Sequence, residues 1–473
     1  MVQGDSVSMP AGQGKYLQSQ KAKAGASFSS GKIANGETVA ISSPYSTIEF
    51  IPGGEISHWY LKEYPKEYKN KKSEFVDLVS STGSQNAPYY SVTSLKTETG
   101  VLLYYNDNGL EIKKEIILNK EKKYEVLVRY YIKNNSNYQT DVSVFKWGPG
   151  IAGTVMPREI AITSMAKKPV ITKGQKIKEE LKLGSDYSWV GIRQKHFAVV
   201  FVPQASSGQT IIVSKEDQSL YMDAVLEKIP PGAKISGEMV IYGGPKQEDA
   251  LKAASADLSA LINYNVLGKA IFFFLKLFYS VFKNYGVAII LLALLLKLIL
   301  FPLTKISLRS MQSMQKLQPQ IAILRERFKN DAEGLNRETM ELYKRLKVNP
   351  LGGCLPVLVQ LPIFWALFIV LQDAIGLRGA PFVFWIKDLS VKDPFYILPV
   401  LMGVTTFIQQ KMTATDQQQK TMTYFMTIFL TFIFLSFPAG LVLYWLTTNV
   451  VSIFEQRLVV GKPAAKGQPE IVK

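Results

Sequence analysis

The sequence has little of what most enzymes and metalloproteins depend on. Its 473 residues include one cysteine, Cys354, and two histidines, His58 and His196. A single cysteine excludes an internal disulfide framework. Both histidines precede the apolar second half of the chain, which excludes most histidine-based metal binding and acid–base catalysis there. The sequence also shows no nucleotide-binding motif, and we expect a protein that is not an enzyme and uses no cofactor.

Acidic residues are scarce in the second half, where five apolar runs follow one another. The runs cover 284–304, 351–371, 396–411, 421–437 and 440–456. Their lengths and composition are typical of bilayer-spanning helices, which need roughly 20 residues. Asp373 and Glu455 stand at the ends of runs, so we expect that Lys297, in the first run, has no carboxylate partner at its own depth. Without histidine or aspartate inside them, the runs do not fit an intramembrane protease.

Lys297 is the most unusual residue of these runs. A charged side chain at the centre of a bilayer costs on the order of 3 kcal/mol on insertion scales, and it usually faces a bundle interior or a wet cavity. The alternative is a lysine that snorkels or loses its proton. The nearest flanking cation, Lys305, is eight residues further on, roughly 12 Å of helix, and a lysine stem covers only part of that distance. Both interpretations stay open at this point.

The first half is polar and has the alternation of strands. Tyr124–Ile132 alternates as a half-buried strand does, and Asn106–Gly109 is a turn signal. We expect an antiparallel β-sandwich over residues 31–245, after a disordered lead-in over 1–30. The two histidines do not support a sugar-processing enzyme. The net charge of +17 lies mainly in loops and at the edges of apolar runs, which suits a membrane surface better than DNA.

Charge in the connecting segments predicts the topology. Residues 305–349 hold ten basic and five acidic residues, so this segment is expected in the cytoplasm, folded as a helical hairpin. The other expected segments are a helical connector (246–265), an interfacial amphipathic helix (266–283), a periplasmic loop (372–395), a cytoplasmic loop (412–420) and a cytoplasmic tail (457–473). Five spans with an internal C-terminus place the sandwich outside. We therefore expect an N-terminal signal anchor that is missing from this sequence. The predicted fold class is an α+β membrane protein: a periplasmic antiparallel β-sandwich, a five-helix transmembrane core and a cytoplasmic helical hairpin.

Polar residues recur on single faces of the later runs. Thr423, Thr427 and Thr431 are spaced at i, i+4 and i+8, and Tyr444, Thr448 and Ser452 repeat that spacing. Taken singly, such residues usually form hydrogen bonds between membrane helices. Together with Lys297 they predict a hydrophilic groove within the membrane. The residues predicted to line it are Lys297, Gln360, Gln409, Thr423, Thr427, Thr431, Tyr444, Trp445, Thr448 and Asn449.

Three stretches in order resemble the YidC-type membrane protein insertases. They are Phe301-Pro-Leu-Thr-Lys305, Asn349-Pro-Leu-Gly-Gly-Cys-Leu-Pro-Val-Leu-Val-Gln-Leu-Pro-Ile-Phe364 and Phe437-Pro-Ala-Gly-Leu-Val-Leu-Tyr-Trp-Leu-Thr-Thr-Asn449. The resemblance covers residues 266–457, and the β-rich half resembles the external domain of the Gram-negative branch. Lys297 stands where the bacterial family often has arginine, which keeps the charge but loses the bidentate fork.

The resemblance implies a membrane protein insertase and chaperone in the bacterial inner membrane. In such a protein the groove cation attracts acidic groups of the translocating segment, and Tyr444 and Trp445 match positions that contact substrate. The implied partners are nascent membrane proteins and the lipid bilayer, with the Sec translocon and the ribosome as further candidates and no DNA. A small-solute transporter is the alternative, although the runs show neither an inverted repeat nor a second coupling charge.

Overall fold

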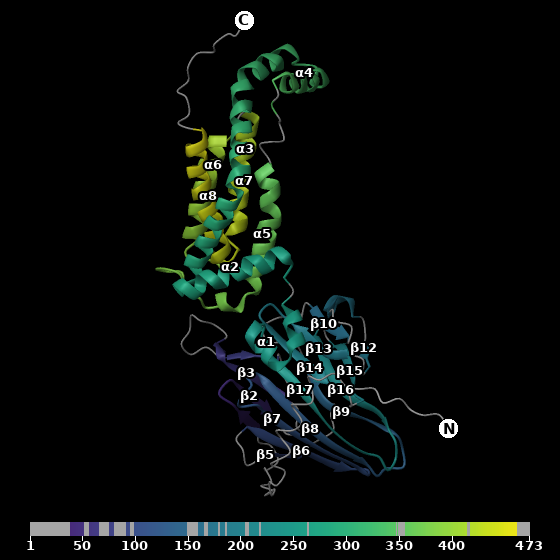
Figure 1. The fold of residues 1–473 in the computed structure, drawn as a ribbon. Helices are drawn as coiled ribbons and strands as arrows, with labels where there is room; N and C mark the ends of the chain where they lie inside the picture. Colours follow the sequence, from purple (N-terminus) through teal and green to yellow (C-terminus); the bar gives the residue numbers. More distant parts are fainter. Residues whose placement is uncertain are drawn as a thin grey trace, which may run out of the picture. The chain divides into compact units, whose positions relative to one another are not determined.

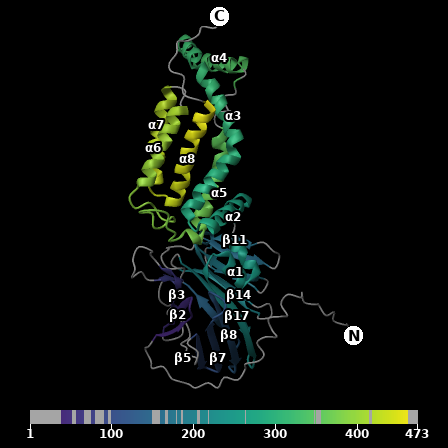
Figure 2. The same ribbon diagram turned by 60° about the vertical axis from the view of Figure 1, so that its left-hand side comes forward.

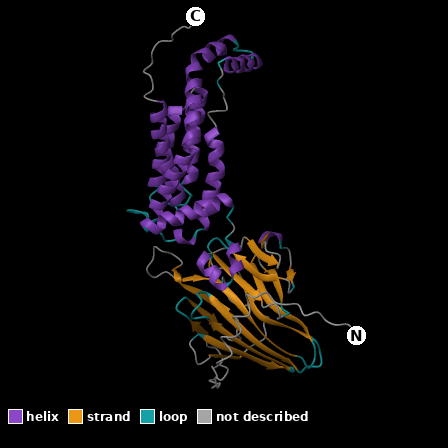
Figure 3. Cartoon of the chain, viewed as in Figure 1, coloured by secondary structure: helices purple, strands orange, loops and turns teal. Residues whose placement is uncertain are grey.

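The computed structural model describes most of residues 38–460. Within that range it leaves out 52–55, 66–74, 80–90, 95–98, 149–158, 165–168, 178–179, 185–186, 204–207, 217–218, 263, 347, 349–354 and 414–416. The predicted lead-in, the expected missing anchor, the start of the motif at Asn349 and most of the predicted tail therefore fall outside the described residues. The chain divides into two compact units, a β-rich unit drawn mainly from the first half and a helical unit that includes everything after Gly243. This order of a β-rich region followed by helices is the one predicted (Figure 3).

The β-rich unit is built from strands in three sheets (Figure 1). The strands are β1 (Val39–Ser42), β2 (Ser46–Phe50), β3 (Ile56–Pro65), β4 (Phe75–Asp77), β5 (Ser91–Ser94), β6 (Gly100–Asp107), β7 (Leu110–Leu118), β8 (Glu125–Asn134), β9 (Thr140–Trp147), β10 (Glu159–Ser164), β11 (Pro169–Lys173), β12 (Glu180–Leu183), β13 (Tyr187–Arg193), β14 (Phe197–Pro203), β15 (Thr210–Glu216), β16 (Ser219–Ile229) and β17 (Lys234–Pro245). The largest sheet has the order β11-β10-β13-β14-β17-β8-β7-β6-β5, and two four-stranded sheets have the orders β1-β2-β3-β4 and β12-β15-β16-β9. The pairs β6–β7, β7–β8 and β8–β17 are antiparallel, and β6–β7 is the hairpin that the turn signal at Asn106–Gly109 predicts.

One lysine is buried in the core of the β-rich unit. The Nζ of Lys114, on β7, donates to the carbonyl oxygen of Ser143 on β9 at 2.5 Å, which links the largest sheet to a smaller one. The Oγ of Ser143 donates to a carboxylate oxygen of Asp223 at 2.6 Å. Burial lowers the pKa of Lys114 to about 7, because the opposing attraction of Asp223 offsets only part of the desolvation. Burial raises the pKa of Asp223.

The helical unit contains helices of very different lengths. They are α1 (Glu248–Ala254), α2 (Val266–Phe282), α3 (Tyr285–Arg327), α4 (Ala332–Arg345), α5 (Leu355–Asp373), α6 (Ile397–Thr413), α7 (Gln417–Phe434) and α8 (Ala439–Val460), with short 3-10 turns at Ala256–Leu261 and Ile375–Leu377. In Figures 1 and 2, α3, α5, α6, α7 and α8 run side by side, and α2 lies across one end of this bundle. The core of the bundle includes Leu275, Leu292, Leu367, Met402 and Leu441, one each from α2, α3, α5, α6 and α8.

Local sequence fixes where α3 begins. The side-chain oxygen of Asn284 accepts from the backbone N–H groups of Gly286 and Val287, which caps the helix. The Asn284 amide also donates to the carbonyl oxygen of Phe382 at 3.1 Å. Gly286 is required here, because a Cβ atom would lie 2.0 Å from the ring of Phe382. The start of α3 is thereby held against the loop that precedes α6.

The helix α3 continues well past residue 304, where we expect the first span to end. It is a single helix of 43 residues with Pro302 and Pro319 inside it. Its last turns pack against α4 through Leu317, Ile321 and Leu342, which form a small buried cluster. This segment thus contains a pair of packed helices, of which the first is the end of α3, and that the pair is a cytoplasmic hairpin stays a prediction.

By length and composition, one of the described helices, α3, can cross a membrane. Parts of α5 and α7, Leu358–Asp373 and Tyr424–Phe434, are apolar but shorter. That α5, α6, α7 and α8 also span the bilayer stays a prediction.

Candidate functional site in the helical unit

Lys297 belongs to α3, and its side chain contacts α8. Its Nζ donates to the hydroxyl of Ser452 and to a carboxylate oxygen of Glu455, the latter at 3.0 Å. The side chains of Lys297 and Glu455 are 14% and 7% exposed, so the ion pair is largely shielded. Ser452 in turn donates to the carbonyl oxygen of Thr448, one turn earlier in α8. The lysine ammonium, the serine hydroxyl and the glutamate carboxylate form one connected polar site.

This ion pair corrects the expectation that Lys297 has no carboxylate partner. The apolar run ends at residue 456, which predicts that Glu455 lies at the end of the helix. The helix α8 instead extends to Val460, which places Glu455 inside it. Ser452 and Glu455 are three residues apart and hence on one face. Continuing the 444–448–452 repeat by three residues is the sequence signal that could have found Glu455.

One contact and the lengths of the two helices explain how residues 158 positions apart meet. A Cβ atom on Gly440, in the first turn of α8, would lie 3.2 Å from the side chain of Ile289 in α3, so the two helices start at the same end of the bundle. Lys297 is 12 residues after Tyr285, about 18 Å along α3, and Glu455 is 16 residues after Ala439, about 24 Å along α8. The lysine stem spans the remaining difference.

Other predicted groove residues on α8 face different helices. The Nε2 of Gln360, on α5, donates to the hydroxyl of Tyr444 at 2.7 Å, and Tyr444 is buried. The ring of Trp445 packs edge-on against Phe364, with 5.1 Å between centroids. Thr448 donates to the carbonyl oxygen of Trp445, in its own helix.

Asn449 joins α8 to α6. Its amide donates to the Thr406 hydroxyl at 2.8 Å and, at longer range, to the hydroxyl of Thr405 and the carbonyl oxygen of Met402. Both Asn449 and Thr406 are buried. These bonds fit the helix–helix hydrogen bonding that single polar residues usually provide in membrane proteins.

Thr427 and Thr431, on α7, lie between that helix and α6. The hydroxyl of Thr427 donates to the Gln410 side chain at 2.6 Å, and Thr431 donates to the Thr427 carbonyl oxygen. Gln409 is half-buried on α6. Thr423 is in α7, but its side chain falls outside the described part. The structure thus distributes the predicted residues over several helix pairs. Within the described part of the chain, Lys297 makes its polar contacts with Ser452 and Glu455.

Unlike a soluble helical protein, the bundle exposes many large apolar side chains on its outer surface. On α7 the side chains of Phe425, Ile428 and Phe432 are 68%, 72% and 73% exposed, whereas that of Thr427 is buried. Leu298 on α3 and Trp365 on α5 are exposed as well. Exposed apolar surface of this extent marks contact with a partner or a membrane.

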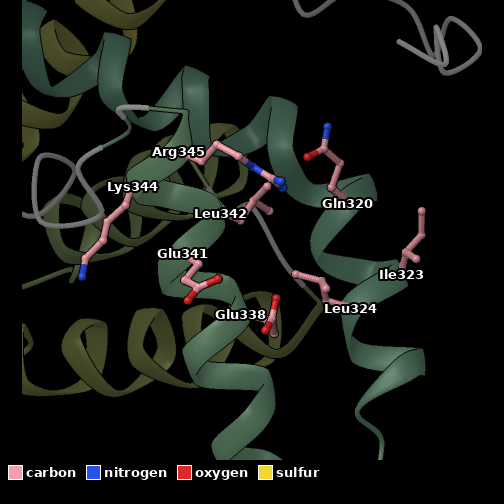
Figure 4. A pocket seen from close by; sticks show the side chains of 8 residues that line it. All are labelled: Gln320, Ile323, Leu324, Glu338, Glu341, Leu342, Lys344 and Arg345. Carbon is pink, nitrogen blue, oxygen red and sulfur yellow. The ribbon is translucent and has the colours of Figure 1, made fainter. Parts of the chain in front are cut away.

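A hollow of about 430 Å³ lies where α4 packs on the end of α3 (Figure 4). Leu324 of α3 points toward Glu338 of α4, while Arg345 extends toward Gln320. The lining is mixed in charge, and it contains none of the predicted groove residues.

Comparisons with known proteins point to one family. The family model described as YidC periplasmic domain matches residues 38–280, and the model described as 60Kd inner membrane protein matches residues 277–465. The membrane protein insertase YidC of Citrifermentans bemidjiense is 44% identical over 291 residues, covering 60% of this chain and 54% of the relative. That of Geotalea daltonii is 39% identical over 385 residues, covering 78% of this chain and 70% of the relative.

The chain spans about half the length of the first of these relatives. Among solved structures, an active YidC insertase crystallised with its first transmembrane domain resolved is 18% identical, with a TM-score of 0.44. It covers 91% of this chain and 94% of its own.

Proposed function

Because this chain belongs to the YidC family, we propose that it is an insertase that transfers apolar segments of nascent membrane proteins into the bacterial inner membrane. The observation that carries the proposal is Lys297, a cation held inside a helical bundle whose outer surface is apolar. The names of the relatives support insertion as the function, and we assign it to the polar site around Lys297 as part of the proposal. Both relatives described above are insertases by name, so the transporter alternative receives no support from them.

In this proposal α3, α5, α6, α7 and α8 all cross the bilayer. The latter four contain 17 to 22 residues, and such helices are about 26–33 Å long, comparable with a hydrocarbon core of roughly 30 Å. Their exposed apolar side chains then contact lipid. The helix α2 lies in the interface, the β-rich unit is periplasmic, and the α3–α4 pair with its basic residues is cytoplasmic.

The proposed mechanism uses attraction and partitioning without breaking bonds. Hydroxyl and amide groups of α5, α6, α7 and α8 line a hydrophilic groove that lowers the cost of bringing polar residues into the bilayer. Lys297 attracts an acidic group in the short segment that must cross. The adjoining apolar segment then moves into lipid, and burial of its side chains supplies the driving force, at roughly 25 cal/mol per Å².

The test is insertion by the purified chain in liposomes of phosphatidylethanolamine and phosphatidylglycerol. The substrate is a short single-span protein with an acidic tail, and insertion is measured as protection of that tail from added protease. We expect protection with wild type and background with protein-free liposomes. Equal protection in the two would refute the proposal. Because no other protein is present, the result also reports whether the chain works alone.

A charge-free variant tests the role of the site. Replacing both partners, Lys297→Met with Glu455→Gln, leaves no unpaired buried charge and removes the cation. We expect insertion of the acidic-tailed substrate to fall about tenfold, the change that 1.4 kcal/mol gives. Lys297→Arg keeps the charge and should keep most activity, and Lys269→Met on the exposed surface of α2 is the matched control. Full activity of the double variant would remove Lys297 from the mechanism.

A further inference from the structure

We propose that Glu455 is an internal counterion that competes with the substrate for Lys297, and so sets which translocating segments the site accepts. The inference rests on the proposed function and adds a selectivity element to it. A segment with a carboxylate can replace Glu455 at the ammonium, whereas a neutral segment cannot. The site therefore discriminates by the charge of the crossing segment.

The geometry fits a reversible contact. Glu455 reaches the ammonium with one carboxylate oxygen at 3.0 Å, and the contact is a single hydrogen bond where an arginine would have allowed a bidentate pair. Glu455 is the only acidic residue of α8. Within the described part of the chain, its carboxylate is also the one that reaches Lys297. Glu455 thus decides whether the Lys297 ammonium has a counterion from the described part of the chain.

The ammonium has room for a second anion. Lysine carries three N–H donors, and two of them are used, by Ser452 and Glu455. No contact for the third donor is made within the described residues. Since the Lys297 side chain is 14% exposed, an approaching carboxylate can bind this third donor before Glu455 leaves. Exchange by this route never leaves the ammonium without an anion.

Ser452 keeps the cation in place during exchange. Its own proton is directed to the Thr448 carbonyl oxygen at 2.8 Å, so its oxygen lone pairs are free to accept from Lys297. The ammonium therefore stays bound to α8 through the serine when Glu455 is displaced. A buried ion pair is weak evidence for stability, because desolvation of both charges offsets much of their attraction. The large cost falls on a charge left without a partner, and a substrate carboxylate that replaces Glu455 keeps the ammonium paired.

The substrate class follows from the chemistry. The favoured crossing segment is short and carries at least one aspartate, glutamate or terminal carboxylate at a depth that reaches Lys297. Serine- or glutamine-rich segments of the same length lack the negative charge needed to compete. Basic segments are disfavoured, because they would bring a second cation to the ammonium.

The experiment compares two substrates in the liposome assay, one with two glutamates in its tail and one with glutamines at the same positions. The measured quantity is the ratio of acidic to neutral insertion. Glu455→Gln removes the competing anion, and we expect this ratio to rise about tenfold. Glu455→Asp keeps a carboxylate and should stay near the wild-type ratio. Glu248→Gln, which breaks the ion pairs with Lys252 and Lys276, is the matched control and should leave the ratio unchanged.

The outcomes separate the two hypotheses. If Glu455 only holds α3 to α8, Glu455→Gln lowers insertion of both substrates equally and the ratio does not move, which overturns the inference. A falling ratio overturns it as well. If wild type inserts neither substrate, the proposed function itself has failed. Thermal unfolding of each variant, measured alongside, corrects the rates for the fraction of folded protein.

Discussion

Removing one partner of the Lys297–Glu455 pair should cost much more stability than removing both. At 3.0 Å and an effective dielectric constant of 20, two unit charges attract each other by about 5–6 kcal/mol. Much of that attraction is offset by desolvation, since the side chains are only 14% and 7% exposed. The net benefit of the pair over two neutral side chains is therefore small.

Single variants should show the cost of an unpaired buried charge. We expect Lys297→Met to lower the free energy of unfolding by about 3–5 kcal/mol. For Glu455→Gln we expect about 2–3 kcal/mol, because the amide oxygen can still accept from the lysine. The double variant should lie within about 1 kcal/mol of wild type.

The assay is thermal unfolding of the four proteins in one detergent, followed by tryptophan fluorescence. The quantity that decides is the difference between the double variant and the sum of the two single variants. We expect the double variant to be more stable than that sum by about 3 kcal/mol or more. Additive effects would mean that the two side chains do not interact, and the electrostatic reasoning for the site would be wrong.

Three further predictions concern other parts of the chain. Between pH 7 and pH 10.5 the unfolded chain holds more protons at Lys114 than the folded chain, so stability of the β-rich unit should rise with pH in this window by a few kcal/mol. Urea unfolding followed by circular dichroism measures the slope, which Lys114→Met should abolish; a slope that persists contradicts the assignment. Gly403→Val should cost about 1–3 kcal/mol, because a Cβ atom there lies 2.5 Å from the hydroxyl of Thr431; the neighbouring exposed Val404→Ala is the control in thermal unfolding. Leu342→Ala should cost about 2–4 kcal/mol locally and open the α3–α4 pair to limited proteolysis, while the bundle stays resistant.

Much of the architecture could be predicted from residue patterns because each pattern is local. Alternation in Tyr124–Ile132 and the turn at Asn106–Gly109 depend on neighbouring residues alone, and so do the apolar runs. The buried Lys114 could not be predicted in this way, because its contact with Ser143 joins two strands in different sheets. Residue 114 shares the buried face of β7 with Ile112 and Ile116, but a lysine at such a position is usually taken as exposed.

The candidate site shows the same division between local and distant information. The sequence singles out Lys297 because a charge is rare in an apolar helix. Its partner depends on the relative register of α3 and α8, which packing contacts such as that of Gly440 with Ile289 set. The last apolar run of the sequence ends near Glu455, whereas the helix α8 continues to Val460. A run of apolar residues indicates which part of a helix is apolar, and the helix itself can extend beyond that part.

The unbroken course of α3 has a mechanical consequence. Lys297 and Gln320 belong to one helix and are 23 residues apart, about 35 Å along its axis. If α3 rotates about its axis near Lys297, the face of α3 that packs against α4 rotates with it. Between Lys297 and Gln320, α3 contains two prolines, Pro302 and Pro319. Each lacks a backbone N–H group, so these are the positions where the helix can bend. A fluorescent label attached at position 320 would consequently report a rotation of α3 caused by a change at Lys297.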